Sequence, residues 1–310
     1  MMFKNTGQIF LIKSFDLSLE EKSFYKDLNF KHFIFFKEHF KRDFRAYLEN
    51  LKQNLNLGFL AVDQEGGRVC RIDGDFKSPL EIASLYQEKK DENIVRSWAK
   101  KIAETVKNYN LNLNLAPCVD LADEKVEDFL RNRTFGKDPD LVKRLAKIFI
   151  EEHKKQSIFT CIKHFPGLKD IEIDPHKELP FKERLDKESL KVFKFFIKKN
   201  MSFIMTTHIL IKEIENIPVT FSEKMISFLR KKLNYKGLIF TDDLNMGALN
   251  KWELQERIIL SIASGHNILI FCGYWENLAQ AIFDIKSELE KSQILKERLK
   301  ESLFVLKRYF

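Results

Sequence analysis

Short apolar runs recur along the whole chain and alternate with charged segments in which apolar residues return at helical spacing. Continuous apolar runs of this length are typical of strands in a parallel sheet covered on both faces, and the segments between them are typical of amphipathic helices. Eight runs predict strands, at Gln8–Ile12, His32–Phe36, Gly58–Asp63, Asn112–Ala116, Phe159–Lys163, Phe203–Thr207, Leu238–Thr241 and Asn267–Phe271. The intervening segments predict helices, among them Asp43–Gln53, Asp91–Tyr109, Leu141–Lys155, Leu185–Lys199, Ser222–Lys232, Leu254–Ala263 and a closing helix in Ser292–Phe310, whose apolar face we expect at Ile294, Leu295, Leu299, Leu303 and Leu306.

Eight strand–helix units fit a closed barrel better than an open doubly-wound sheet. A (β/α)₈ barrel needs about 250 residues, and the chain has 310. No low-complexity linker interrupts the repeat, so we expect an α/β fold in which residues 1–310 form a single TIM-barrel domain. The reactive groups of such barrels follow the carboxyl ends of the strands. Polar residues that end the apolar runs are therefore the candidate site residues.

Composition and charge exclude several other classes of protein. The net charge of +8 comes from 53 basic and 45 acidic residues that are intermixed, which predicts a solvated basic surface and no nucleic-acid interface, with a preference for anionic substrates left open. No apolar run is long enough for a membrane span or a signal-peptide core, so we expect a cytoplasmic protein. The many Phe residues, 29 in all, are interpreted as a compositional habit. Four separated cysteines without a CxxC pair predict buried free thiols and no zinc site, at Cys70, Cys118, Cys161 and Cys272.

The third predicted strand runs into the sequence Asp63-Gln64-Glu65-Gly66-Gly67-Arg68. Paired glycines allow a tight turn and the close approach of a ligand to the backbone. Asp63 can accept hydrogen bonds from sugar hydroxyls, and Arg71 can return over the site as a donor. The alternative is a strand-terminating turn in which the acid only caps the backbone.

The fifth predicted strand ends in Lys163-His164-Phe165-Pro166-Gly167, followed by a polar loop with Asp174-Pro175-His176. Lys163 and His164 can bind ring hydroxyls through charge-assisted hydrogen bonds. Asp174 and His176 share a face if the loop is extended, and a carboxylate beside an imidazole fixes its tautomer and raises its basicity. Such an imidazole suits a residue that gives and then takes a proton. A surface hydrogen bond is the alternative for this pair.

The seventh predicted strand ends in the acids Asp242 and Asp243, which could serve as a nucleophile or as metal ligands. A metal site needs several converging carboxylates or imidazoles at known ligand spacing, such as HExxH, and the sequence has no such motif. A carboxylate nucleophile for glycosyl transfer needs one oriented Asp and a separate proton donor. The sequence therefore favours a nucleophile and implies neither a metal nor a cofactor.

Five motifs in this order resemble glycoside hydrolase family 3, and more closely its single-domain bacterial β-N-acetylhexosaminidases of peptidoglycan recycling. The resemblance runs from about residue 7 to the end of the chain. It is carried by Asp63-Gln64-Glu65-Gly66-Gly67-Arg68, by Arg133-Thr134-Phe135-Gly136 with Asp138-Pro139, by Lys163-His164-Phe165-Pro166-Gly167, by Met205-Thr206-Thr207-His208, and by Thr241-Asp242-Asp243-Leu244-Asn245-Met246.

The resemblance implies a role for each matching position. It implies that Asp242 is the nucleophile and that His176 is a loop-borne general acid/base with Asp174 as its partner, while Asp243 receives no role. It also implies sugar-binding residues at Asp63, Arg71, Arg133, Lys163 and His164, and a pocket-lining residue at His208. The implied reaction is double displacement with retention, and the implied substrate is N-acetylglucosamine linked β-1,4 to 1,6-anhydro-N-acetylmuramic acid, with or without peptide. We expect a monomer whose partner is this carbohydrate.

The chain departs from the family's usual pattern in two places. Leu168-Lys169 stands where His-Gly is common, and Pro175 stands where Ser is common. Since proline fixes its own φ and restricts the preceding residue, the loop that carries His176 is expected to be stiffer or differently posed. A phosphorylase, a β-glucosidase or β-xylosidase of the same family, and a non-catalytic sugar-binding barrel remain as alternatives.

Overall fold

The computed structural model describes residues 3–14, 16–122 and 129–310, and its centre is a closed barrel of parallel strands. Around the barrel the strands follow the order β1-β12-β11-β9-β7-β6-β3-β2. The predicted α/β barrel is confirmed, and each of the eight predicted runs overlaps one of its strands. These are β1 (Phe10–Lys13), β2 (His32–Phe35), β3 (Leu60–Val62), β6 (Leu113–Asn114), β7 (Phe159–Phe165), β9 (Phe203–Thr206), β11 (Leu238–Asp243) and β12 (Ile268–Phe271).

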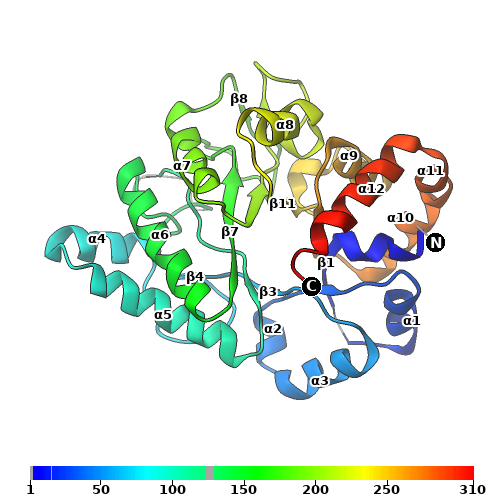
Figure 1. Ribbon diagram of the computed structural model, residues 1–310, viewed down its shortest axis with the longest axis horizontal. Helices are drawn as coiled ribbons and strands as arrows, with labels where there is room; N and C mark the ends of the chain where they lie inside the picture. The colour runs from blue at the N-terminus through cyan, green and yellow to red at the C-terminus, as the bar shows by residue number, and fades with distance from the viewer. Residues whose placement is uncertain (1–2, 15, 123–128) are drawn as a thin grey trace.

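Helices surround the strands on the outside of the barrel (Figure 1). In chain order they are α1 (Leu19–Asp27), α2 (Lys37–Phe40), α3 (Phe44–Asn54), α4 (Pro79–Lys89), α5 (Glu92–Asn108), α6 (Pro139–Lys155), α7 (Lys187–Lys198), α8 (Glu223–Ser227), α9 (Leu254–Ser264), α10 (Trp275–Asp284), α11 (Lys286–Lys291) and α12 (Gln293–Leu306). Short 3-10 or π-helical segments add η1 (Phe3–Ile9), η2 (Val219–Phe221), η3 (Phe228–Lys232) and η4 (Gly247–Leu249). Two small sheets lie outside the barrel, the antiparallel pair β4 (Gln64–Gly66) and β5 (Val69–Cys70) and the parallel pair β8 (Phe181–Lys182) and β10 (Leu210–Ile211).

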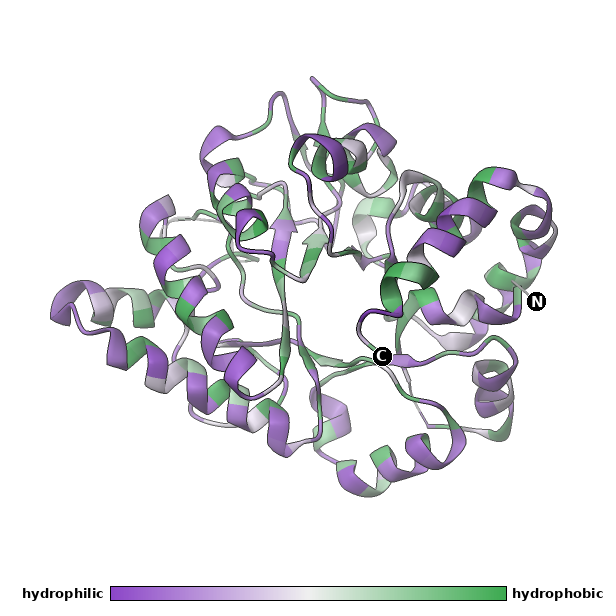
Figure 2. Cartoon of the chain, in the orientation of Figure 1, coloured by the Kyte–Doolittle hydropathy of each residue, from purple (hydrophilic) through white to green (hydrophobic). Residues whose placement is uncertain are grey.

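The helices pack on the barrel because each one has an apolar stripe at helical spacing. Along α5, Val95, Trp98, Ile102 and Val106 are buried, while the lysines between them face solvent. Figure 2 shows this contrast, with green and purple alternating along the helices. The helix begins at Glu92 because the Asp91 side chain accepts a hydrogen bond from the amide of Asn93.

Two details of the predicted helices were wrong. Ser222–Lys232 is not one α-helix, because α8 ends at Ser227 and the chain continues in the π-helical turn η3. In α12, Leu295, Leu299 and Leu306 are buried as expected, but the side chain of Ile294 is 62% exposed because it lies outside the stripe that faces the barrel.

Aromatic side chains fill the amino-terminal end of the barrel. Phe59, Phe159 and Phe203 pack with ring centroids 5.1 to 5.9 Å apart at the starts of three strands. Tyr309 and Phe310, which follow α12, cover this cluster at 5.0 Å from Phe203 and 4.6 Å from Phe59. Several of the many Phe residues therefore form a packed layer inside the barrel. The interpretation of the high Phe content as a compositional habit does not account for this structural role.

Two further expectations concern the cysteines and the membrane. All four thiols are free, and Cys118 and Cys161 are buried, whereas Cys70 and Cys272 are only half-buried, so the prediction of burial was wrong for these two. Among the described helices, none has both the length and the apolar character needed to cross a membrane.

Candidate active site

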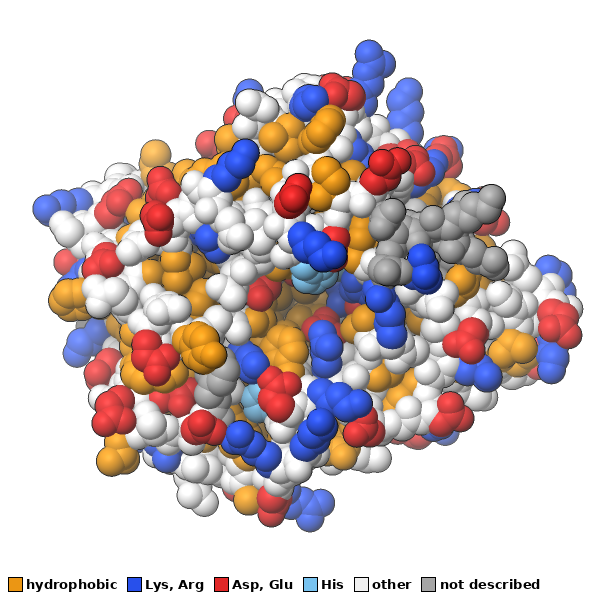
Figure 3. Space-filling model, turned by 180° about the vertical axis from the view of Figure 1, so that it is seen from behind, with side chains coloured by type: hydrophobic (Ala, Val, Ile, Leu, Met, Phe, Trp, Pro, Cys, Tyr) orange, Lys and Arg blue, Asp and Glu red, His pale blue; other side chains and the backbone are white. Residues whose placement is uncertain are grey.

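A pocket of about 460 Å³ opens at the carboxyl ends of the barrel strands. Figure 3 shows this face of the molecule, with a depression near its centre and Lys, Arg and His side chains around it. The pocket brings together eight of the nine residues that the sequence predicted for the site, namely Asp63, Arg71, Arg133, Lys163, His164, Asp174, His176 and Asp242. They come from different strand ends and loops, so only the closed barrel makes them neighbours.

A network of four buried or nearly buried charges forms one wall of the pocket. The Nζ atom of Lys163 lies 2.7 Å from Asp63 Oδ1 and 2.6 Å from Glu65 Oε1. Glu65 also accepts two hydrogen bonds from Arg133, at 2.9 Å from Nε and 2.8 Å from Nη2. Although burial opposes ionisation, Arg133 and Lys163 hold the pKa of Glu65 well below its usual range. Two basic and two acidic side chains are thus paired with one another along the pocket wall.

Arg71 reaches the same wall from the short hairpin formed by β4 and β5. Its guanidinium lies 5.1 Å from the centre of the Phe36 ring, and its Nη2 atom is 3.7 Å from Asp63 Oδ2. Gln64 shapes this hairpin, since its side-chain oxygen accepts hydrogen bonds from the amides of Arg71 and Ile72. The arginine therefore lies over the strand-end acid, as expected from the sequence.

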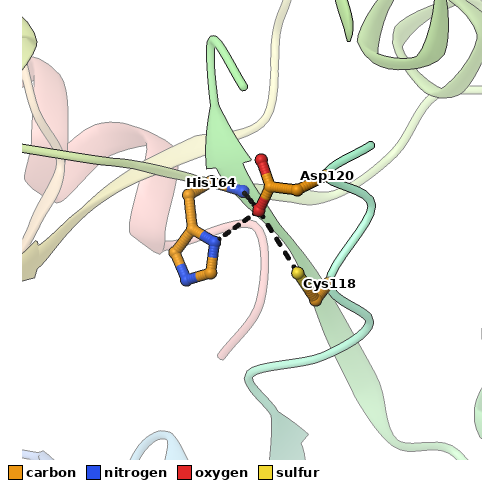
Figure 4. Close-up of side chains that lie close together, drawn as sticks. All are labelled: Cys118, Asp120 and His164. Carbon is orange, nitrogen blue, oxygen red and sulfur yellow. Dashed lines mark hydrogen bonds and ion pairs between the residues drawn. The ribbon is translucent and has the colours of Figure 1, made fainter. Parts of the chain in front are cut away.

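His164 is oriented by Asp120, a residue that the sequence analysis did not single out (Figure 4). Asp120 Oδ2 lies 2.7 Å from His164 Nδ1 and 3.1 Å from the His164 amide, and Asp120 Oδ1 accepts from the amide of Leu168 at 2.8 Å. Leu168 is one of the two departures from the family pattern, and only its backbone takes part. The ring nitrogen Nε2 points away from Asp120, so it is available for a hydrogen bond on the other side of the ring (Figure 4).

Cys118, Asp120 and His164 are also residue types that hold transition metals, and their ligand atoms lie within 4.8 Å of one another. Their existing bonds argue against that use. The Cys118 thiol donates to Asp120 at 3.2 Å, and burial together with the Asp120 charge raises the pKa of this thiol well above its usual value. Since the thiolate is the form that ligates metals, a neutral thiol in this place supports an orienting network for His164.

Asp242 is held in its ionised form at the end of β11. Burial opposes ionisation, but His164, His208 and a hydrogen bond of 2.9 Å from the Asp243 amide lower the pKa of Asp242 below its ordinary value. The neighbouring Asp243 differs, because burial raises its pKa to about 6. One oxygen of Asp243 accepts hydrogen bonds from the amides of Asn245 and Cys272, each at 3.0 Å. Of the two acids, Asp242 is the better placed to act as a nucleophile, and Asp243 braces the turn that follows.

Asp174 and His176 face each other as predicted, but for a different geometric reason. The segment is a turn and not an extended loop, and Asp174 Oδ1 lies 2.9 Å from the His176 amide and 2.7 Å from its Nδ1. Burial alone would raise the pKa of Asp174, but hydrogen bonds from the His176 amide and ring lower it below its ordinary value. The carboxylate therefore accepts from Nδ1–H and leaves Nε2 of the exposed ring available to a substrate.

His208 was wrongly expected to line the pocket. Its side chain has 0% exposure and lies beneath the pocket wall, where Nδ1 is 2.6 Å from Thr220 Oγ1 and Nε2 is 2.9 Å from the carbonyl oxygen of Asp243. The strand-end rule placed it near the mouth, but the inward or outward direction of a residue just past a strand is set by the loop that follows. His208 instead supports the backbone next to Asp242.

Sequence reasoning quoted Glu65 without assigning it a role and did not quote Asp120. The sequence could have identified Glu65 as a site residue, because an acid between a strand end and paired glycines lies at the same barrel face as Asp63. Asp120 had a weaker one, as it is the first acid after the fourth predicted strand. Its contact with His164 joins positions 44 residues apart, which only the tertiary structure reveals.

The family profile described as glycosyl hydrolase family 3 N terminal domain matches residues 19–307. The chain belongs to glycosyl hydrolase family 3. Within this family, it is 29% identical over 280 residues to a protein of Photobacterium profundum named beta-hexosaminidase, covering 87% of this chain and 83% of that protein. It is 30% identical over 278 residues to a beta-hexosaminidase of Neisseria meningitidis, covering 84% of this chain and 76% of that one.

Solved structures of other proteins share the fold. A β-N-acetylhexosaminidase from Beutenbergia cavernae superposes with a TM-score of 0.86 at 20% identity and covers 99% of this chain and 98% of its own. CbsA from Thermotoga neapolitana, solved with bound zinc, gives a TM-score of 0.89 at 23% identity and covers 99% of this chain and 67% of its own. At such low identity these structures establish the barrel and not the substrate.

Proposed function

We propose that this family 3 barrel is a retaining β-N-acetylglucosaminidase with Asp242 as nucleophile and His176 as general acid/base. The observation that carries the proposal is the convergence in one pocket of an ionised Asp242 and a carboxylate-paired His176. A nucleophile and a separate proton donor are the two groups that retaining glycoside hydrolysis needs. The beta-hexosaminidase names of the relatives support the same reaction.

The reaction proceeds by two displacements at the anomeric carbon. The Asp242 carboxylate attacks this carbon while Nε2–H of His176 protonates the leaving oxygen, so that the glycosidic C–O bond breaks and a glycosyl–Asp242 ester forms. His176 then takes a proton from water, and the resulting hydroxide attacks the same carbon and releases Asp242. Asp174 stabilises the protonated imidazole, and two inversions leave the configuration retained.

The remaining pocket residues bind and orient the sugar. Lys163, His164, Arg71 and Asp63 supply hydrogen-bond donors and acceptors that suit ring hydroxyls, and Arg133 adds a guanidinium beside them. We propose that the substrate is N-acetylglucosamine linked to 1,6-anhydro-N-acetylmuramic acid, with or without peptide. The single-domain organisation, cytoplasmic location and monomeric state expected from the sequence stay predictions.

An assay with an aryl β-N-acetylglucosaminide and the matching aryl β-glucoside, each with and without phosphate, tests the proposal. We expect selective hydrolysis of the N-acetylated substrate without any need for phosphate. A phosphate-dependent sugar phosphate would instead identify a phosphorylase, preference for the glucoside would identify a β-glucosidase, and binding without turnover would identify a non-catalytic barrel.

Two variants test the assigned roles. Asp242→Ala should remove nearly all turnover while sugar binding and Tm change little. Near-normal activity of this variant would contradict the assignment of Asp242 as nucleophile. His176→Ala should slow substrates with poor leaving groups far more than activated aryl substrates, which need little protonation. Equal losses on both kinds of substrate would contradict the acid/base role.

A further inference from the structure

The turn that carries His176 is docked on η4, the helical turn that follows β11 and Asp242. The Gly247 amide donates to the carbonyl oxygen of His176 at 3.1 Å, and the Ala248 amide donates to that of Pro175, also at 3.1 Å. Both contacts join backbone to backbone. The position of the proposed acid/base therefore depends on how closely two loops from different strands can approach each other.

Gly247 is the residue that permits this approach. A Cβ atom at this position would lie 2.6 Å from the carbonyl oxygen of His176 and 2.5 Å from that of Lys177, closer than side-chain carbons come to such atoms. The φ angle of Gly247 is not in the left-handed region, so its backbone conformation suits alanine as well as glycine. The collision with the His176 turn is therefore the reason for a glycine here.

The segment that leads to Gly247 is itself fixed to the nucleophile strand. Asp243 accepts hydrogen bonds from the Asn245 amide through its carboxylate and from the Met246 amide, at 3.0 Å, through its carbonyl oxygen. A rigid turn thus runs from Asp242 to Gly247 and then meets the His176 turn. The same few residues determine where the nucleophile and the proton donor lie.

We propose that Gly247 is a positioning residue that sets the place of His176 relative to Asp242. The inference rests on the proposed role of His176 as acid/base. Gly247 is not among the residues that line the pocket. Its absent side chain lets the His176 turn come within hydrogen-bonding distance of η4, and a methyl group in its place pushes the imidazole away from the leaving group.

Gly247→Ala tests the proposal, with Asn250→Ala as a matched control. Asn250 is the exposed residue that caps the carboxyl end of the same helical turn. Among the described residues, its side chain makes no hydrogen bond to the His176 turn. For Gly247→Ala we expect kcat/KM on an unactivated disaccharide to fall about 10- to 100-fold, because small displacements of a proton donor are costly. The loss on an activated aryl substrate should be much smaller, and Asn250→Ala should leave both rates near those of the wild type.

The leaving-group dependence separates positioning from a general structural defect. Equal losses on both substrates with a lowered Tm, or unchanged rates on both, would overturn the role of Gly247. If wild type is active and His176→Ala shows the leaving-group dependence while Gly247→Ala does not, only this inference fails. If wild type has no glycosidase activity, the proposed function itself fails.

Amide hydrogen exchange of the wild type gives an independent measurement that does not depend on whether the variant folds. The amides of Gly247 and Ala248 bond to the His176 turn, and those of Lys177 and Glu178 bond within it, to the carbonyl oxygen of Asp174. If the two loops form one unit, these four amides exchange through a common opening with similar protection. Strong protection in η4 beside an unprotected His176 turn would contradict the docking.

Discussion

At the scale of single residues, Glu65 shows how a side chain outside the proposed chemistry controls the groups within it. Its two carboxylate oxygens are shared between Arg133 and Lys163, and its side chain is 1% exposed. Removing one partner of a buried ion pair leaves an uncompensated charge, which is more costly than losing an exposed pair. Glu65 is therefore a contact that Arg133 shares with Lys163, which also pairs with Asp63 at 2.7 Å.

Glu65→Gln should therefore weaken substrate binding and lower stability together. The amide keeps the size of the side chain but turns an NH₂ donor towards a cation. Lys163 and Arg133 should therefore lose the ion pairs that both make with residue 65. We expect KM to rise about tenfold or more and the free energy of unfolding to fall by roughly 3–5 kcal/mol. Steady-state kinetics and chemical denaturation measure the two effects.

A matched change in an exposed pair gives the control for Glu65→Gln. Glu49 pairs with Lys52 at 2.8 Å on the surface of α3, where Glu49→Gln should change little because exposed pairs contribute about 0–1 kcal/mol. A Glu65 variant with normal KM and normal stability would show that Lys163 and Arg133 hold their places without it.

At the scale of elements, the strands were predictable and several helices were not. Each barrel strand overlaps a mostly apolar, buried run of the sequence that contrasts with the charged segments around it, so a pattern along the sequence is enough to find it. The helix α4 had its own signal, a capping box of Ser78 and Glu81 with Pro79 at the first helical position, and it was still not named. The short helices α2 and α11 have too few residues for a periodic pattern.

The site was predictable only in part. The sequence places the residues at strand ends, but it does not reveal the contacts between loops. Asp63, Lys163 and Asp242 end apolar runs, and the barrel rule brings them together. The docking of the His176 turn on Gly247 and the burial of His208 depend on loop conformation, which no local pattern specifies. Pro175 lies inside the turn and contributes its carbonyl oxygen to this docking.

The hairpin of β4 and β5 offers a prediction at this scale. Gly66 has φ +101°, and a Cβ atom there would lie 2.6 Å from the carbonyl oxygen of Lys77 and 2.9 Å from the Trp98 ring. Gly66→Ala should therefore combine backbone strain, of order 1–3 kcal/mol, with a displacement of the hairpin that carries Glu65. We expect a lower Tm and a raised KM.

Gly136→Ala separates the two effects in the hairpin. Gly136 has a similar φ of +111°, but among the described residues no atom beyond its two chain neighbours lies within 4 Å of the Cβ position. It should show the loss of Tm from strain while KM stays near normal. The same rise in KM in both variants would mean that strain alone, without displacement of the hairpin, disturbs the site.

At the scale of the whole molecule, the two ends of the barrel have separate tasks. The carboxyl end holds the charged pocket, and the amino end is closed by the aromatic cluster that Tyr309 and Phe310 complete. In barrels of this kind, loops at the catalytic end vary without disturbing the packed interior. Substitutions in the aromatic cluster should therefore change stability and leave catalysis intact.

Tyr309→Ala is the test of this separation. Its half-buried ring contacts Phe159 and Phe203 at centroid distances of 5.6 and 5.0 Å, so its loss should lower the free energy of unfolding by about 1–3 kcal/mol, less than for a fully buried aromatic ring. Thermal unfolding should show a lower Tm, while kcat/KM at a temperature where both proteins are folded should match the wild type. Phe283→Ala, which removes a ring that is 70% exposed on α10, should change neither quantity. A fall in kcat/KM for Tyr309→Ala alone would show that packing at the amino end is transmitted through the strands to the pocket, and the two ends of the barrel would then not be independent.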